Sequence, residues 1–136
     1  MAMTFENLPD DWADQPISTP GLIADVVDLF LRDSDRDADS ILALLCDDRG
    51  RILAPIVFWD VEWLEPEREG GEFFSSLAEA PTPQAVFAIS SRWPIPEALA
   101  LRWRRTAERI LGPAGVDVVG FFSACPGRVW AVEAAA

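Results

Sequence analysis

The sequence lacks histidine, lysine and tyrosine, and it holds only two cysteines in 136 residues. Histidine is the commonest general base near neutral pH and a very common zinc ligand. Its absence therefore argues against zinc catalysis and against imidazole acid–base chemistry. We expect no bound metal and no cofactor.

Basic residues are also scarce, because eleven arginines stand against 23 acidic residues and the net charge is −12. Binding to phosphate backbones needs clustered lysine and arginine, so direct nucleic-acid binding is disfavoured, and so are anionic membranes. Residues 1–48 hold twelve of the acids against only Arg32 and Arg36. The sequence therefore predicts an acidic surface on the N-terminal third.

Long apolar runs are missing as well. No segment approaches the roughly 20 apolar residues that span a bilayer. The opening residues, MAMTFENLPDD, lack the basic and apolar regions of a signal peptide. We therefore expect a cytoplasmic protein with no membrane contact, in which Cys46 and Cys125 are reduced.

What is present is a globular composition, since half of the residues are hydrophobic. A chain of this length fits one domain that buries a core without disulfides or metal. Residues 1–19 are polar and acidic, and their apolar residues are spaced too irregularly for a helix. We expect an extended acidic arm there, with Trp12 as a candidate contact residue, followed by a single α/β domain over residues 20–136.

Local patterns predict the elements of that domain. Thr19 supplies an N-cap hydroxyl and Pro20 a first helical residue, and apolar residues then recur at helical spacing to about Arg32. Two apolar runs joined by the turn DDRG predict a hairpin. In all, we expect strands at 41–46, 51–61, 85–90, 116–125 and 128–133, and further helices at 72–80 and after Pro96.

The predicted order is α-β-β-α-β-α-β-β, with near-continuous apolar strands that imply a sheet covered on both faces. The expected fold class is therefore α/β, a three-layer sandwich with a mixed sheet. On the helix after Pro96, one apolar stripe is predicted to face the core, formed by Leu99, Trp103, Ala107 and Ile110.

Another face of the same helix carries three arginines. Arg102, Arg105 and Arg109 recur at three and four residues, so they share one side of the helix. This side is a candidate surface for an anion or an acidic partner. The alternative is a solvated face paired with Glu108 and with the acidic N-terminal third.

The alternating acids of residues 33–39 suggest a calcium loop. An EF-hand loop that starts at Asp33 needs glycine and glutamate at positions where the chain has Ala38 and Leu44. We therefore interpret this run as a solvated acidic connection.

Catalysis without zinc would have to use other side chains. Asp60 and Glu62, with Glu65, follow a predicted strand and are candidates for an acid–base pair, and Cys125 is a candidate nucleophile with no imidazole to activate it. Acids placed by chance and a buried thiol are the alternatives. Trp63 beside these acids is a candidate exposed contact residue, with core packing as the alternative.

The element order and hydrophobic pattern of residues 20–133 resemble the JAB/MPN domain, and within it the bacterial RadC-like branch. The likeness runs from ILALLCDDRGRIL, similar to the family's first hairpin, through GEFFSSLAEAPTPQAVFAIS to the closing strands in VDVVGFFSACPGRVWAVE. Such a likeness implies a fold, whereas function depends on the site. A cytidine-deaminase-like arrangement, which also depends on zinc, is the alternative fold.

Active members of the JAB/MPN family carry a His-x-His-Pro motif after the third strand, then a Ser and an Asp on the next helix. These residues hold a zinc that activates water. With Pro94 matched to the motif's proline, the two His positions fall on Ser91 and Trp93, and the Ser and Asp positions fall on Leu101 and Arg104. The resemblance therefore implies a vacated metal site, that is, a pseudoenzyme.

These observations together predict a non-catalytic protein-interaction module that binds an unidentified protein partner through the acidic third and the arm around Trp12. A zinc-independent enzyme and an acidic mimic of nucleic acid that occupies a DNA-binding protein are the alternatives. We also expect a homo-oligomer that associates through the C-terminal half, where Trp93, Trp103 and Trp130 lie within 38 residues.

Overall fold

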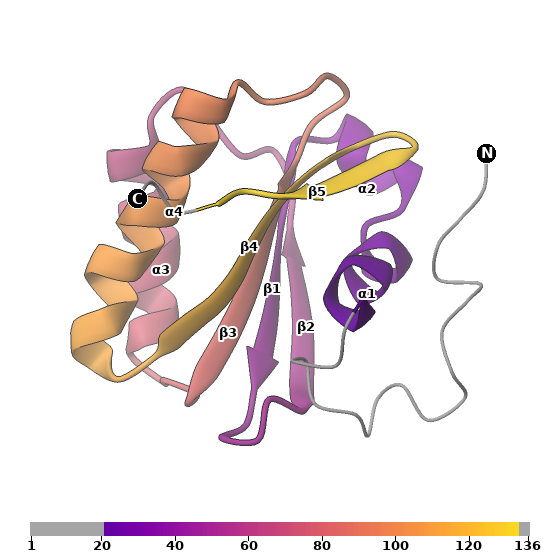
Figure 1. Cartoon of the computed structure of the whole chain (residues 1–136). Helices are drawn as coiled ribbons and strands as arrows, with labels where there is room; N and C mark the ends of the chain where they lie inside the picture. Colours follow the sequence, from indigo (N-terminus) through magenta and orange to yellow (C-terminus); the bar gives the residue numbers. More distant parts are fainter. Residues whose placement is uncertain (1–20, 134–136) are drawn as a thin grey trace.

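The computed structural model describes residues 21–133, in which five strands form one mixed sheet (Figure 1). The strands lie in the order β2-β1-β3-β4-β5. β3 and β4 run parallel, and the other neighbouring pairs are antiparallel. Their bounds are β1 Ser40–Cys46, β2 Ile52–Phe58, β3 Gln84–Ser90, β4 Asp117–Cys125 and β5 Arg128–Ala131.

Helices cover both faces of this sheet (Figure 1). α3 (Gly71–Ala78) and α4 (Glu97–Leu111) pack on one face, and α1 (Leu22–Phe30) packs on the other. The connections hold α2 (Asp33–Asp37), the π-helical turn η3 (Pro66–Gly70) and the 3₁₀ turn η4 (Gly112–Ala114). The predicted α/β class with a mixed sheet is confirmed, and the strands and longer helices follow the predicted order, with α2 as an addition.

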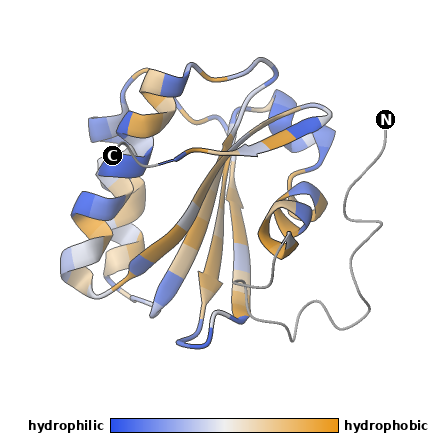
Figure 2. Cartoon of the chain, in the orientation of Figure 1, coloured by the Kyte–Doolittle hydropathy of each residue, from blue (hydrophilic) through white to orange (hydrophobic). Residues whose placement is uncertain are grey.

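The central strands β1 and β3 explain why both faces are covered. Both are buried at nearly every position, and they appear as apolar bands through the middle of the molecule (Figure 2). Along β3, Phe87 and Ile89 belong to the core under α3 and α4, whereas Val86 and Ala88 belong to the core under α1. Side chains alternate across a strand, so a continuously apolar strand needs a cover on each side.

The amphipathic character of α4 is confirmed. Trp103 and Ala107 are fully buried, and Leu99 and Ile110 pack against the same core from half-buried positions. This stripe packs α4, which connects the parallel strands β3 and β4 in the chain, against the core on one face of the sheet. The orientation of this stripe also determines which side of α4 faces residues 91–96, the segment between β3 and α4.

The start of α1 differs from the prediction. The helix begins at Leu22, after Gly21 in the left-handed conformation with φ 75°. A glycine adopts this backbone geometry at little cost, which sets the entry of the chain into the helix. The helix ends at Phe30, two residues before the predicted end. The predicted cap, Thr19 with Pro20, lies outside the described residues.

The acidic run after α1 was predicted to be a solvated connection, and Asp33 and Asp37 are indeed exposed, but the run is helical and anchored rather than open. Residues 33–37 form α2, and Arg36 within it is only 1% exposed. Its guanidinium pairs with Asp28 of α1 across 2.9 Å and donates to the carbonyl oxygens of Leu31 and Cys125. The run folds against the sheet because its single cation finds buried acceptors on α1 and at the end of β4.

Candidate functional site

Three segments of the chain meet at the end of β3. Ser91, directly after β3, donates its hydroxyl hydrogen to Oδ1 of Asp39 across 2.7 Å. The same oxygen accepts the indole N–H of Trp63 at 3.3 Å. These residues, hereafter the Asp39 cluster (Asp39, Trp63 and Ser91), join the entry to β1, the loop after β2 and the exit from β3.

Backbone geometry fixes the cluster in place. Asp39 and Asp60 both adopt positive φ, at 53° and 61°, a conformation that aspartate tolerates better than most residues. The amide of Asp60 donates to the carbonyl of Ala38, and the amide of Val61 donates to that of Asp39. The chain leaving β2 is therefore pinned to the chain entering β1, and the strand alternation predicted to continue to residue 61 stops at Phe58.

An open cavity of about 320 Å³ lies beside the Asp39 cluster. The loop after β2 and the segment leading into α4 supply its apolar lining, which includes Val61, Ile95, Pro96 and Leu99. Two residues that line it, Leu64 and Trp93, are the most exposed large hydrophobic side chains of the described chain, at 74% and 72%.

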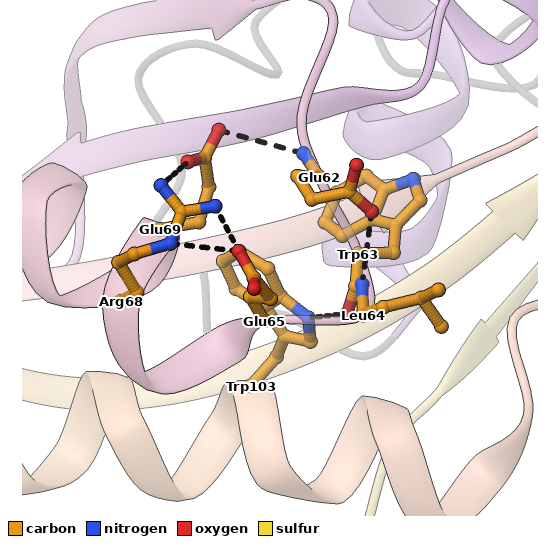
Figure 3. Close-up of polar contacts among 7 residues, drawn as sticks. All are labelled: Glu62, Trp63, Leu64, Glu65, Arg68, Glu69 and Trp103. Carbon is orange, nitrogen blue, oxygen red and sulfur yellow. Dashed lines mark hydrogen bonds and ion pairs between the residues drawn. The ribbon is translucent and has the colours of Figure 1, made fainter.

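Trp63 belongs to the core, so the prediction that it is an exposed contact residue is wrong and the core alternative holds. Its side chain is 8% exposed and lies edge-on to Trp103, with ring centroids 5.0 Å apart. The indole N–H of Trp103 donates to the carbonyl of Trp63 at 2.9 Å (Figure 3). Burial is favourable because both indole N–H groups have acceptors.

The carboxylates after β2 hold their own loop together (Figure 3). Glu62 accepts the amide N–H of Leu64 at 3.5 Å, and Glu69 accepts that of Glu62 at 3.4 Å. Arg68 pairs with Glu65 and lies 3.9 Å from Glu69. The carboxylates of Glu62, Glu65 and Glu69 are thus engaged in contacts within the loop. They are not arranged as an acid–base pair around a shared substrate position.

Cys125 lies at a different cavity from Glu62. It is buried and lines an open space of about 560 Å³, together with Asp33, Asp37 and Trp93. Arg36 donates to its backbone carbonyl at 3.0 Å, so this cation is directed at the main chain and not at the thiol. The structure therefore does not unite the candidate nucleophile with the candidate acids.

The four positions that the resemblance assigns to zinc ligands do not meet. Ser91 and Trp93 line the 320 Å³ cavity, but Leu101 packs against the core and Arg104 donates to a backbone carbonyl after β5 at 2.6 Å. Leu101 and Arg104 project roughly 200° and 140° around α4 from Leu99, the helix residue that lines the cavity.

The side chains at this edge do not fit zinc. The Ser91 hydroxyl donates to Asp39, the indole N–H of Trp93 is a donor only, and Leu101 has no ligand atom. Within residues 21–133, no group of three or more His, Cys, Asp or Glu residues is placed to hold a metal ion. The Ser91 hydroxyl donates directly to the Asp39 carboxylate, so the pair lacks the imidazole base of a Ser-His-Asp triad.

The arginine face of α4 is exposed, as predicted, and carries Arg102, Arg105 and Arg109. Arg102 pairs with Glu67 of η3 across 2.6 Å, and its hydrogen bond lowers the pKa of that carboxyl group. Glu108, the predicted partner of this face, instead lies 3.4 Å from Arg104. The charge of this face is thus partly neutralised by Glu67 of η3.

Trp12 and the rest of residues 1–19 lie outside the described residues.

Sequence reasoning missed Asp39, which it placed within the solvated acidic run. The available signal was its position two residues before the apolar run that begins at Ile41, where a side chain reaches the edge of the sheet. Its partner Ser91 is 52 residues away, beyond the range of any local pattern.

Comparisons with protein-family models, curated proteins and solved structures gave no match to this chain. Among the helices of the described chain, none combines the length and the apolar character that crossing a membrane requires. Function therefore has to be inferred from the cavity beside the Asp39 cluster and from the residues around it.

Proposed function

We propose that this chain is a non-catalytic protein-interaction module with a JAB/MPN-like fold and a vacated zinc site. One observation carries the proposal: Leu64 and Trp93, the most exposed large apolar side chains described, line the same cavity at the edge of β3. Single exposed apolar residues are normal, but aromatic and aliphatic side chains gathered around a concave site are typical of binding surfaces.

The Asp39 cluster supports this role by making the surface rigid. Its hydrogen bonds hold the loop that carries Leu64 and the segment that carries Trp93. The guanidinium of Arg92 lies 5.8 Å from the centroid of the Trp93 ring, which restrains the ring without covering it. A surface already ordered before binding loses less conformational entropy when a partner docks.

Several carboxylates of the acidic N-terminal third are occupied by contacts within the protein. Asp28, Asp35 and Asp39 all turn carboxylate oxygens toward protein donors. An apolar contact around Trp93 is therefore a better account of binding than carboxylates that mimic nucleic-acid phosphates. The likeness to JAB/MPN domains supports the fold part of the proposal through element order and hydrophobic pattern alone.

Affinity capture from the native host, with the full chain as bait, tests the proposal. The wild-type chain should recover a defined partner, and a Leu64→Ala, Trp93→Ala double variant should lose it. Leu53→Ala, which truncates an exposed apolar residue on β2 outside this cavity, is the matched control and should keep it. Equal recovery by the double variant and the wild type would refute the assignment of this surface.

A further inference from the structure

A third cavity, of about 270 Å³, is lined by the end of β2, the chain that follows it and α3. It opens between the end of β2 and α3, where Phe73 and Leu77 lie one helical turn apart. Phe58 and Trp59 form its outer wall. We call it the α3 groove, defined by Phe58, Trp59, Glu69, Glu72, Phe73 and Leu77.

The apolar wall of the α3 groove is exposed yet fixed. Phe58 and Trp59 are 47% and 58% exposed. Phe58 lies edge-on to Phe73, with ring centroids 4.9 Å apart. The indole N–H of Trp59 donates to Asp35 of α2 at 2.8 Å, which holds the ring in place. Ordered aromatic surface of this kind binds a partner at low entropic cost.

The charge at the groove has one sign. Glu69 and Glu72 are its only charged lining residues among those described. Glu69 already lies 3.9 Å from Arg68, but no ion pair in the described chain involves Glu72. A cationic side chain would therefore be attracted to Glu72 across the mouth of the groove.

This charge disfavours the two occupants that the chain itself could supply. Residues 1–19 contain four acids and no lysine or arginine, so they carry the same sign as the groove. A second copy of the chain has a net charge of −12 and is opposed for the same reason. The favoured occupant is a basic segment of a different protein.

The edge of the sheet limits how that segment can bind. β2 is an edge strand, and Pro55 lies within it. Proline has no backbone N–H, so it interrupts the row of donors that an added strand would need. We therefore expect the partner segment to bind by inserting a side chain into the α3 groove. A space of about 270 Å³ is small for a cofactor and suits one bulky side chain.

We infer that the α3 groove binds a peptide segment of another protein that inserts one bulky apolar side chain between Trp59 and Leu77 and sets a lysine or arginine against Glu72. The inference rests on the proposed function, because it names a second surface and a partner chemistry for a chain that acts by binding. The lining of the α3 groove shares only Val61 with the cavity beside the Asp39 cluster.

The test uses the ¹⁵N-labelled full chain and three short synthetic peptides. One has a central phenylalanine flanked by lysines, one replaces the lysines with glutamates, and one replaces the phenylalanine with alanine. The first should bind saturably and shift the indole N–H signal of Trp59 and the amide signal of Leu77. Each of the others should bind at least about tenfold more weakly, because one loses the apolar anchor and the other reverses the charge.

Matched variants complete the test. Trp59→Ala should weaken the first peptide about tenfold, and Glu72→Gln about threefold, whereas the Leu53→Ala control on the same strand should leave affinity unchanged. Equal binding of the lysine and glutamate peptides, or no binding of any peptide, would overturn the inference. Shifts confined to residues around Leu64 and Trp93 would overturn it too, while leaving the proposed function intact.

Discussion

Trp63 and Trp103 meet edge-on, at 74° and 5.0 Å between ring centroids, although 40 residues separate them in the chain. The contact joins the loop after β2 to the middle of α4. Trp103 therefore holds the fold, whereas Trp93 is exposed.

Truncation of these two types of tryptophan should have very different effects on stability. Trp103→Ala removes a fully buried ring and should lower the free energy of unfolding by about 3–5 kcal/mol. Trp93→Ala removes an exposed ring and should change it by less than about 0.5 kcal/mol. Urea denaturation followed by circular dichroism measures both. A large loss for Trp93→Ala would mean that its ring packs within the fold.

The buried ion pair between Arg36 and Asp28 should be essential for the packing of α1. Arg36→Ala removes a buried ion pair with Asp28 and the hydrogen bonds to the carbonyls of Leu31 and Cys125, so we expect a loss of about 3–5 kcal/mol in unfolding free energy. Arg51→Ala, which removes an exposed pair with Asp47, is the control and should stay close to the wild type. Equal stability of the two variants would show that Arg36 does not anchor the helix.

The thiol of Cys46 should make stability depend on alkaline pH. Burial, and then the charge of Asp47, raise the pKa of Cys46 from 9.0 to about 11. Above pH 9.0 the unfolded chain releases this proton while the folded chain keeps it, so unfolding becomes easier as pH rises through this window. Below pH 9.0 the thiol is protonated in both the folded and the unfolded chain, so its contribution to the free energy of unfolding is fully present.

Unfolding measured between pH 8 and pH 11 tests this expectation. The wild type should lose more stability over that range than Cys46→Ala. If Cys46→Ala shows the same alkaline loss as the wild type, the loss arises from another group.

Self-association through the C-terminal half remains a prediction. Trp103 is buried and cannot contribute, which leaves Trp93 and the half-buried Trp130, whose ring lies 4.3 Å from the guanidinium carbon of Arg128. Because acidic repulsion opposes contact between two copies, added salt should strengthen association. Light scattering over a concentration and salt series would show this. A monomer at every concentration, or a dimer that dissociates as salt rises, would contradict the prediction.

The sheet and α4 were predictable because their signals are local. A strand that is apolar at every position, such as β3, has few alternatives to burial between two layers, and the spacing of Leu99, Trp103 and Ala107 identifies the buried side of α4. Each of these patterns depends on neighbours within a few residues. These patterns therefore predict their elements without knowledge of the remaining fold.

The site was not predictable because its contacts are long-range. Asp39 lies in a run of alternating acids that is typical of a solvated connection, and its partner Ser91 lies 52 residues further along the chain. Arg36 in the same run reaches a backbone carbonyl 89 residues away. Trp63 was ambiguous for a related reason: the positive φ of Asp60 redirects the chain after β2. Local alternation therefore could not tell whether its ring would point inward.

The central claim about the edge at the end of β3 is that its zinc site is vacated. Calorimetric titration of zinc into the purified full chain tests it most directly. The account predicts no saturable binding at micromolar zinc, since the Ser91 hydroxyl donates to Asp39. The other positions that the resemblance assigns to ligands, Trp93, Leu101 and Arg104, offer no ligand set. One zinc per chain, with affinity lost in Asp39→Ala and Ser91→Ala, would contradict it.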